Sequence, residues 1–255
     1  PYMRACVNMD QGGAIVDLRP YAAKLKWEVG IGTKHVQDAS YPFLIQEKYR
    51  AGYFTHYAGE GTVRSAKLTY QGEEVDLCLC RTKAQFSEEV MKKGKKKRIL
   101  TLEPVEIEFS TLRLKLQTKV IFEEESSNIQ IQRYILEMSD PVAKVELNEY
   151  MVACYGTTEY PEDMMGIQLA CMKGEESRDI SYAYKCREES LEGAESVSAV
   201  IPAIETKVSL STDRSDARGY VREGYAFSPM FTLGYQTEIS DKEVISTWLS
   251  LEKAN

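Results

Sequence analysis

The sequence predicts an all-β protein folded as a large antiparallel sandwich, and three observations carry this prediction. Between Thr111 and Cys154, three runs alternate apolar and polar residues, which puts the apolar side chains on one face of a strand. The runs are residues 112–117, 128–135 and 143–152. Short polar breaks separate them, as antiparallel neighbours require. The chain is also rich in tyrosine, valine, isoleucine and threonine, which favour strands.

The part of the chain before these runs is predicted as hairpins with one helix. Met3–Met9 and Ala14–Leu18 form a hairpin around two glycines, because glycine readily adopts positive φ. Further strands are predicted over 24–29, 43–47, 63–70 and 74–81, with loops over 31–41 and 49–61. Phe86–Lys93 is predicted as a short helix, since Ser87 is followed by two acids and lysines end the segment.

The part after the central runs adds more short strands and no obvious domain boundary. They are predicted over 165–172, 180–185, 196–201, 206–211, 227–236 and 244–251. No linker rich in proline or serine and no repeat of the solenoid kind divides the chain. We therefore expect a single β-sandwich domain over residues 1–255.

The net charge and the hydrophobic pattern argue against nucleic-acid binding and against a membrane span. The net charge of −7 argues against a general nucleic-acid binder, which needs a basic surface. No apolar run reaches the ~18 residues of a membrane span, and no signal peptide is visible. These features predict a cytoplasmic protein. The chain starts at Pro1, so a removed leader with secretion, or a longer parent, stays open.

The cysteines, the histidines and one basic run each receive a structural interpretation. The six cysteines are predicted to be reduced and mostly buried, with Cys78 and Cys80 facing the same way on a strand. Two histidines are too few for a histidine-rich metal centre, so no metal and no cofactor is predicted. Lys92–Arg98 is interpreted as a solvated turn in preference to an anion site.

Three segments resemble galactose-mutarotase-like proteins. They are the central segment 120–156, the opening segment 8–18 and the closing segment 240–251. In that family a strand pair is followed by a polar turn and a strand ending in Asn-His before an aromatic residue. Here the corresponding strand carries Asn148, Glu149 and Tyr150. The resemblance implies a β-supersandwich and a sugar bound on its concave sheet, with proton transfer at a sugar carbon as in epimerases or lyases.

Two departures from the family pattern bear on the activity. Glu149 stands where mutarotases carry a histidine, and the family's His-Gly-Phe-type turn has no clear match. His56, in Thr55–Gly59, is the nearest candidate by position. Opening an aldose ring needs a general acid and a general base across the sugar. Ordinary mutarotase activity is therefore not expected.

The candidate site combines these positions with charged neighbours. His56 and Glu149 are predicted as the catalytic pair. The predicted substrate-binding residues are Arg50, Glu60, Arg64, Arg133, Tyr150 and Arg222. An aromatic, glycine-rich loop around His56 suits a sugar, and arginines suit an acidic sugar group.

Each position also has a plainer interpretation. His56 is equally compatible with a loop histidine without a role, Glu149 with a surface acid, and Arg133 with a cross-strand ion pair. The charged segment Asp213–Glu223 is read as a loop, closing over a sugar or simply solvated. Strict alternation also puts Asn148 and Glu149 on opposite faces unless a bulge intervenes.

The functional hypothesis is a carbohydrate-active protein that takes a small-molecule or oligosaccharide substrate. One alternative is a non-catalytic sugar-binding or packing module of a larger enzyme or complex. Another is a structural, self-assembling β protein. A homodimer or a partner domain is compatible with all three.

Overall fold

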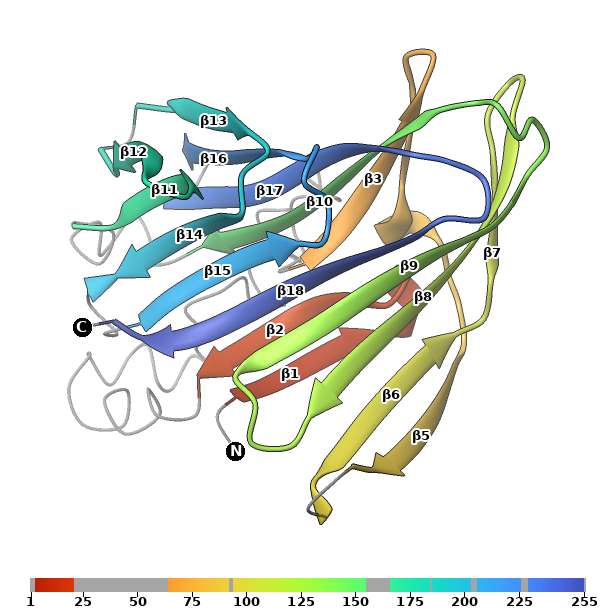
Figure 1. Ribbon diagram of the computed structural model, residues 1–255, viewed down its shortest axis with the longest axis horizontal. Coiled ribbons are helices and arrows are strands. Elements are labelled where there is room, and N and C mark those ends of the chain that lie inside the picture. Colours follow the sequence, from red (N-terminus) through yellow and green to blue (C-terminus); the bar gives the residue numbers. More distant parts are fainter. Residues whose placement is uncertain are drawn as a thin grey trace.

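The computed structural model describes residues 3–20, 64–91, 94–154, 166–183, 185–202, 206–225 and 229–254. Its described residues form two antiparallel sheets packed face to face (Figure 1). No helix within these ranges is long and apolar enough to cross a bilayer. The predicted all-β sandwich is confirmed.

Sheet A runs in the order β1-β2-β3-β10-β17-β16-β13, with β4 beside β3. Its strands are β1 (Met3–Asn8), β2 (Ala14–Pro20), β3 (Arg64–Tyr70), β4 (Glu73–Asp76), β10 (Val145–Cys154), β13 (Glu188–Glu192), β16 (Arg218–Tyr225) and β17 (Pro229–Ile239). The chain thus places strands far apart in sequence next to one another in the middle of this sheet.

Sheet B runs in the order β12-β11-β14-β15-β18-β9-β8-β6-β5, with β7 beside β8. Its strands are β5 (Ala84–Val90), β6 (Lys96–Leu102), β7 (Val105–Glu108), β8 (Arg113–Glu123), β9 (Asn128–Met138), β11 (Gln168–Lys173), β12 (Glu176–Ser181), β14 (Ser196–Ile201), β15 (Thr206–Thr212) and β18 (Val244–Lys253). The three central runs of the sequence become β8, β9 and β10, so one of them crosses to the other sheet.

The core lies between the sheets and follows the period-two pattern. On β9, Ile129, Ile131, Arg133 and Ile135 point inward and are buried, while the alternate residues between them are more exposed. On β10, Val145 and Leu147 do the same from the opposite side. Burying one face of each strand is the main favourable term that holds such a sandwich together.

The first hairpin shows why glycine is needed at its turn. Two three-residue 3-10 helices, η1 (Met9–Gln11) and η2 (Leu77–Leu79), touch there. Gly12 has a φ of 65°, and a Cβ at this position would lie 1.9 Å from the carbonyl oxygen of Leu77. Glycine therefore provides both the left-handed backbone and the close approach of η2.

The helix predicted over Phe86–Lys93 is wrong, because Ala84–Val90 is strand β5. Across the strands, Glu88 forms ion pairs with Lys96 (2.8 Å) and Arg98 (3.2 Å) of β6. The acids and lysines that suggested a helix with charged ends instead pair between two strands. Tertiary pairing overrides the local capping signal here.

Other boundaries also differ from the prediction. The strand predicted over 74–81 ends at Asp76, where the Asp76 carboxylate accepts the main-chain N–H of Cys78 (2.9 Å) and starts η2. Cys78 is buried and Cys80 only half-buried, so they do not share a strand face. Lys96–Leu102 forms β6, where the basic run was interpreted as a turn. The charged segment Asp213–Glu223 was predicted as a loop, but its residues from Arg218 onward belong to strand β16.

Several predictions are confirmed or fall outside the described residues. The hairpin β1–β2 and the strands over 196–201, 206–211 and 244–251 are present. The predicted segments at 24–29, 31–41, 43–47 and 49–61 lie outside the described residues. Within the described part of the chain, Cys78, Cys80, Cys171 and Cys186 are free thiols, and burial raises the pKa of the Cys171 thiol to about 12.

Candidate functional site

Strand β10 separates the predicted site into two faces. It pairs with β17 from Val145 to Cys154 and with β3 from Glu146 to Met151, without a register shift in either ladder. With no bulge, Glu149 points into the sandwich, and Asn148 and Tyr150 point to the outer face of sheet A. One pocket therefore does not hold both Asn148 and Glu149.

On the inner face, Glu149 meets Arg133 from the opposite sheet. The Arg133 Nε lies 2.5 Å from Glu149 Oε1, and Nη2 lies 3.4 Å from Oε2. The remaining Nη1 donates to Thr118 Oγ1 of β8 at 2.7 Å. Arg133 is 4% exposed and Glu149 is 1% exposed. The structure brings these two predicted residues together, but between the sheets, where they bind each other.

On the outer face, two rows of polar groups cross sheet A. The ladder registers place one residue of each strand in the first row: Asp76 (β4), Lys67 (β3), Asn148 (β10), Gln236 (β17), Arg218 (β16) and Glu192 (β13). Beside them, the second row holds Tyr150, Gly234, Tyr220 and Ser190. We call these ten residues the polar band.

Hydrogen bonds connect the rows near β10. The Tyr220 hydroxyl donates to Asn148 Oδ1 at 3.0 Å, crossing β17 over Gly234. A Cβ on Gly234 would lie 2.4 Å from the Tyr220 ring, so only glycine leaves the ring this path. The Tyr150 hydroxyl donates to Asp76 Oδ2 at 3.5 Å. Each tyrosine thus reaches an oxygen two strands away in sheet A.

At the other end of the band, Arg218 contacts both neighbouring strands, β17 and β13. Its Nη1 donates to Gln236 Oε1 (3.0 Å) and its Nη2 to Ser190 Oγ (2.9 Å). Ion pairs with Glu188 (3.5 Å) and Glu192 (3.8 Å) offset its charge. The band therefore carries hydrogen-bond donors and acceptors side by side, and the charge of Arg218 is already balanced.

The other predicted residues fall in different places. Arg222 lies on β16, opposite Thr232 and Glu188, and shares the outer face with Tyr150. The backbone of Arg64 opens β3 opposite Met151 and Ile15. His56, Arg50 and Glu60 lie outside the described residues. Among the described residues of the predicted set, Tyr150, which is 3% exposed, and Arg222 lie on the face of the band.

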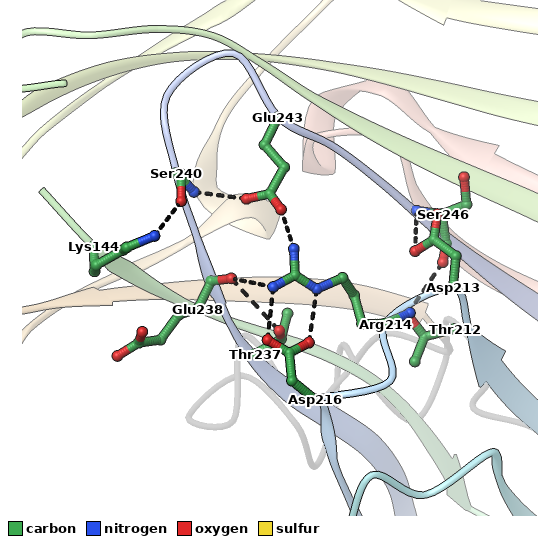
Figure 2. Close-up of polar contacts among 10 residues, drawn as sticks. All are labelled: Lys144, Thr212, Asp213, Arg214, Asp216, Thr237, Glu238, Ser240, Glu243 and Ser246. Carbon is green, nitrogen blue, oxygen red and sulfur yellow. Dashed lines mark hydrogen bonds and ion pairs between the residues drawn. The ribbon is translucent and has the colours of Figure 1, made fainter. Parts of the chain in front are cut away.

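The charged residues of the loop that precedes β16 form ion pairs and hydrogen bonds with one another and with the β17–β18 region. Figure 2 shows the Arg214 guanidinium between Glu243 on one side and Asp216 on the other. Asp216 accepts from Nε (2.9 Å) and Nη2 (2.8 Å), and these bonds lower the pKa of its carboxyl. Asp213 accepts the Ser246 N–H of β18. These charges tie the loop to the β17–β18 turn, and none points to a ligand.

Glu223, at the far end of β16, is a fully buried carboxylate that sequence reasoning did not single out. It accepts the main-chain N–H groups of Ala183 (2.7 Å) and Lys185 (3.1 Å) and the Arg187 Nε (2.7 Å). Burial acts to raise its pKa, but these hydrogen bonds outweigh burial and lower it. Glu223 holds the chain before β13 against the sheet.

Most of the band was also missed by the sequence prediction. A signal for part of it exists, since Arg218, Tyr220 and Arg222 alternate with smaller residues and therefore share one face. This signal is visible only once the segment is recognised as a strand. Gln236 and Asp76 have no such signal, because strand pairing alone brings them beside Arg218 and Lys67.

Comparison with solved structures gives the fold. A putative aldose 1-epimerase from Escherichia coli K12 superposes with a TM-score of 0.58 at 9% identity, covering 99% of this chain and 96% of that one. A galactose mutarotase-like protein from Clostridium acetobutylicum gives 0.56 at 7% identity, covering 100% and 93%. The fold is that of the galactose mutarotase-like proteins. The resemblance seen in the sequence is thereby confirmed.

The galactose mutarotase-like fold also occurs as part of longer chains. An α-N-acetylgalactosaminidase from Bifidobacterium bifidum gives a TM-score of 0.50 at 10% identity, with 75% of this chain matched to 31% of that one. No protein-family model matches this sequence, and no curated protein matches it. At these identities the galactose mutarotase-like likeness establishes the architecture and a carbohydrate-related set of neighbours, and the site must be argued from its own residues.

Proposed function

We propose that this protein binds a carbohydrate on the outer face of sheet A, through the polar band. The supporting observation is the unbroken row from Asp76 to Glu192, which offers carboxylate, ammonium, amide and guanidinium groups across six strands. Sugar hydroxyls both donate and accept, so they match a surface on which donors and acceptors alternate. Solved neighbours described as an aldose 1-epimerase and as mutarotase-like support the same class of ligand.

The balance of charge favours a neutral sugar over an acidic one. Arg218 is already paired with Glu188 and Glu192. In the register of sheet A, Lys67 lies opposite Asp76. Arg133, the arginine that we had expected to take a carboxylate, is bound to Glu149 inside the sandwich. The two cations of the band, Lys67 and Arg218, are outnumbered by the carboxylates of Asp76, Glu188 and Glu192, so this part of the sheet carries no net positive charge for a uronic acid.

Proton transfer at a sugar carbon is the finer proposal. The Tyr150 hydroxyl and the Asp76 carboxylate form a phenol–carboxylate contact on the band. A group that donates a proton beside one that accepts it is the arrangement that acid–base catalysis requires. His56 remains a predicted catalytic residue. Glu149 has its hydrogen bonds with Arg133 and is a poorer candidate than Asp76.

The binding test is a calorimetric titration with a panel of neutral and uronic sugars. We expect a neutral sugar to bind, and Tyr220→Phe to weaken binding by about fivefold because one net hydrogen bond is lost. Tyr134→Phe is the matched control, since the Tyr134 hydroxyl donates to the Gln132 amide oxygen on sheet B (2.8 Å). Binding of no sugar, or equal effects of the two variants, refutes the proposal.

A non-catalytic sugar-binding module is the second candidate function. The observation that favours it is the part-length match to the α-N-acetylgalactosaminidase, where this fold makes up a minority of the chain. The catalytic protein and the non-catalytic module differ in whether the bound sugar is converted. Magnetisation exchange between the anomers of the bound sugar, lost in Asp76→Asn, supports catalysis, and binding without exchange supports the module.

A further inference from the structure

The β5–β6 hairpin carries a free strand edge that no described element covers. β5 is the last strand of sheet B, and within the described ranges it pairs only with β6. Its residues from Gln85 to Val90 are all exposed, on both faces of the hairpin. An open edge presents unpaired N–H and C=O groups to another strand.

The edge is apolar as well as open. Phe86 is 62% exposed and Val90 is 74% exposed. Both lie on the face that also carries Leu100 of β6 and, on β8, Val120, which is fully buried. This face therefore continues the inner face of sheet B beyond the cover of sheet A. Large exposed apolar side chains beside an open edge are typical of an interaction surface.

The charges along the edge are self-complementary. Glu88 is already held by Lys96 and Arg98 of its own hairpin. Lys83 and Glu89, both exposed, form no ion pair with any described residue. They lie three residues before and three residues after Phe86. If two such edges pair antiparallel about Phe86, Lys83 of each copy comes opposite Glu89 of the other.

We propose that the β5 edge pairs with the same edge of a second copy of this chain, in a two-fold interface centred on Phe86. Directly opposite residues share a face, so the two Phe86 rings meet at the axis and Gln85 faces Ser87. Pairing about Glu88 instead would place two like charges opposite each other, which is unfavourable. The charges of the edge thus favour pairing about Phe86 between two copies of this chain over pairing about Glu88.

Sedimentation velocity of the full chain over a range of concentrations tests the interface. We expect a concentration-dependent dimer. Lys83→Glu and Glu89→Lys should each weaken dimerisation by about tenfold or more, because two ion pairs become two repulsions. The double variant Lys83→Glu/Glu89→Lys restores the pairs and should return to the affinity of the original chain.

The controls separate the interface from a change in fold or in net charge. Lys115→Glu makes the same charge change on β8 and should leave the dimer unchanged. Far-ultraviolet circular dichroism of each variant reports whether the sheet is intact. A chain that stays monomeric at every concentration overturns the proposal, as does a double variant no tighter than the single ones.

Discussion

The two faces of strand β10 handle polar residues in opposite ways. On the inner face, Glu149 pairs with Arg133, which reaches it from the other sheet. On the outer face, both residues form hydrogen bonds within their own sheet. Asn148 accepts a hydrogen bond from Tyr220, and Tyr150 donates one to Asp76. Asn148 is half-buried, and Tyr150 and Tyr220 are 3% and 6% exposed. A buried charge must have its partner inside the fold, whereas neutral hydrogen-bonding groups can exchange a partner for a ligand at lower cost. Neighbouring residues on one strand thus serve stability and recognition separately.

The largest expected effect is on the inner face. Arg133→Met removes the charge that offsets the buried Glu149 carboxylate, and should lower the free energy of unfolding by about 3–5 kcal/mol. Arg133→Met/Glu149→Leu removes both charges and should regain most of this loss. Urea denaturation measures all of these values.

Arg98→Met is the control for Arg133→Met, because it breaks an exposed pair with Glu88 and should lower the free energy of unfolding far less. Similar small losses in Arg133→Met and Arg98→Met would show that the buried pair has no special weight. The inner face of β10 would then not have the stabilising role that we assign to it.

The second effect concerns Glu223, another inward carboxylate, and depends on pH. Its pKa is lower in the folded protein than in the unfolded chain, so its contribution is present above the unfolded pKa and is lost as pH falls through the folded pKa. Glu223→Gln should lower stability by about 1–3 kcal/mol near neutral pH. In acid the gap between the two proteins should close. Denaturation curves taken from neutral to acidic pH measure the gap, and a constant gap would contradict this assignment.

The smallest expected effect concerns Gly234, which lies under the Tyr220 ring on the outer face of sheet A. Gly234→Ala places a methyl group against the Tyr220 ring and should lower stability by about 1–2 kcal/mol, with weaker sugar binding, because Tyr220 must leave Asn148. In a Tyr220→Ala background the obstacle is gone, so Gly234→Ala should be neutral or stabilising there. Thermal unfolding and the sugar titration check both backgrounds. A loss of the same size in both would mean that Gly234 has another role.

The sequence was most informative where its alternation was longest. The strands β8, β9 and β10 run over ten or eleven residues each, and their buried positions largely follow the predicted period, although all four residues of Glu149–Val152 on β10 are buried. It was least informative where short local signals compete. Ser87 followed by two glutamates is compatible with a helix start, yet the pairing of Glu88 with β6 makes this segment a strand.

The candidate site followed the same division. Alternation predicted that Asn148 and Glu149 face opposite ways, and the unbroken β10 ladders confirm it. It did not indicate which of the two faces is inside. Nor did it pair Tyr220 with Asn148, since the two residues belong to strands that are separated in the sheet by β17.

By itself the sequence determined the class of the fold, the extent of its central strands and the resemblance to mutarotase-like proteins, because period-two patterning is a local property. Only the tertiary structure decided which sheet each strand joins. That choice buried Arg133 with Glu149, aligned the polar band across sheet A and left the edge of β5 open. These outcomes depend on contacts between residues distant in the chain, and such contacts leave no periodic trace in the sequence.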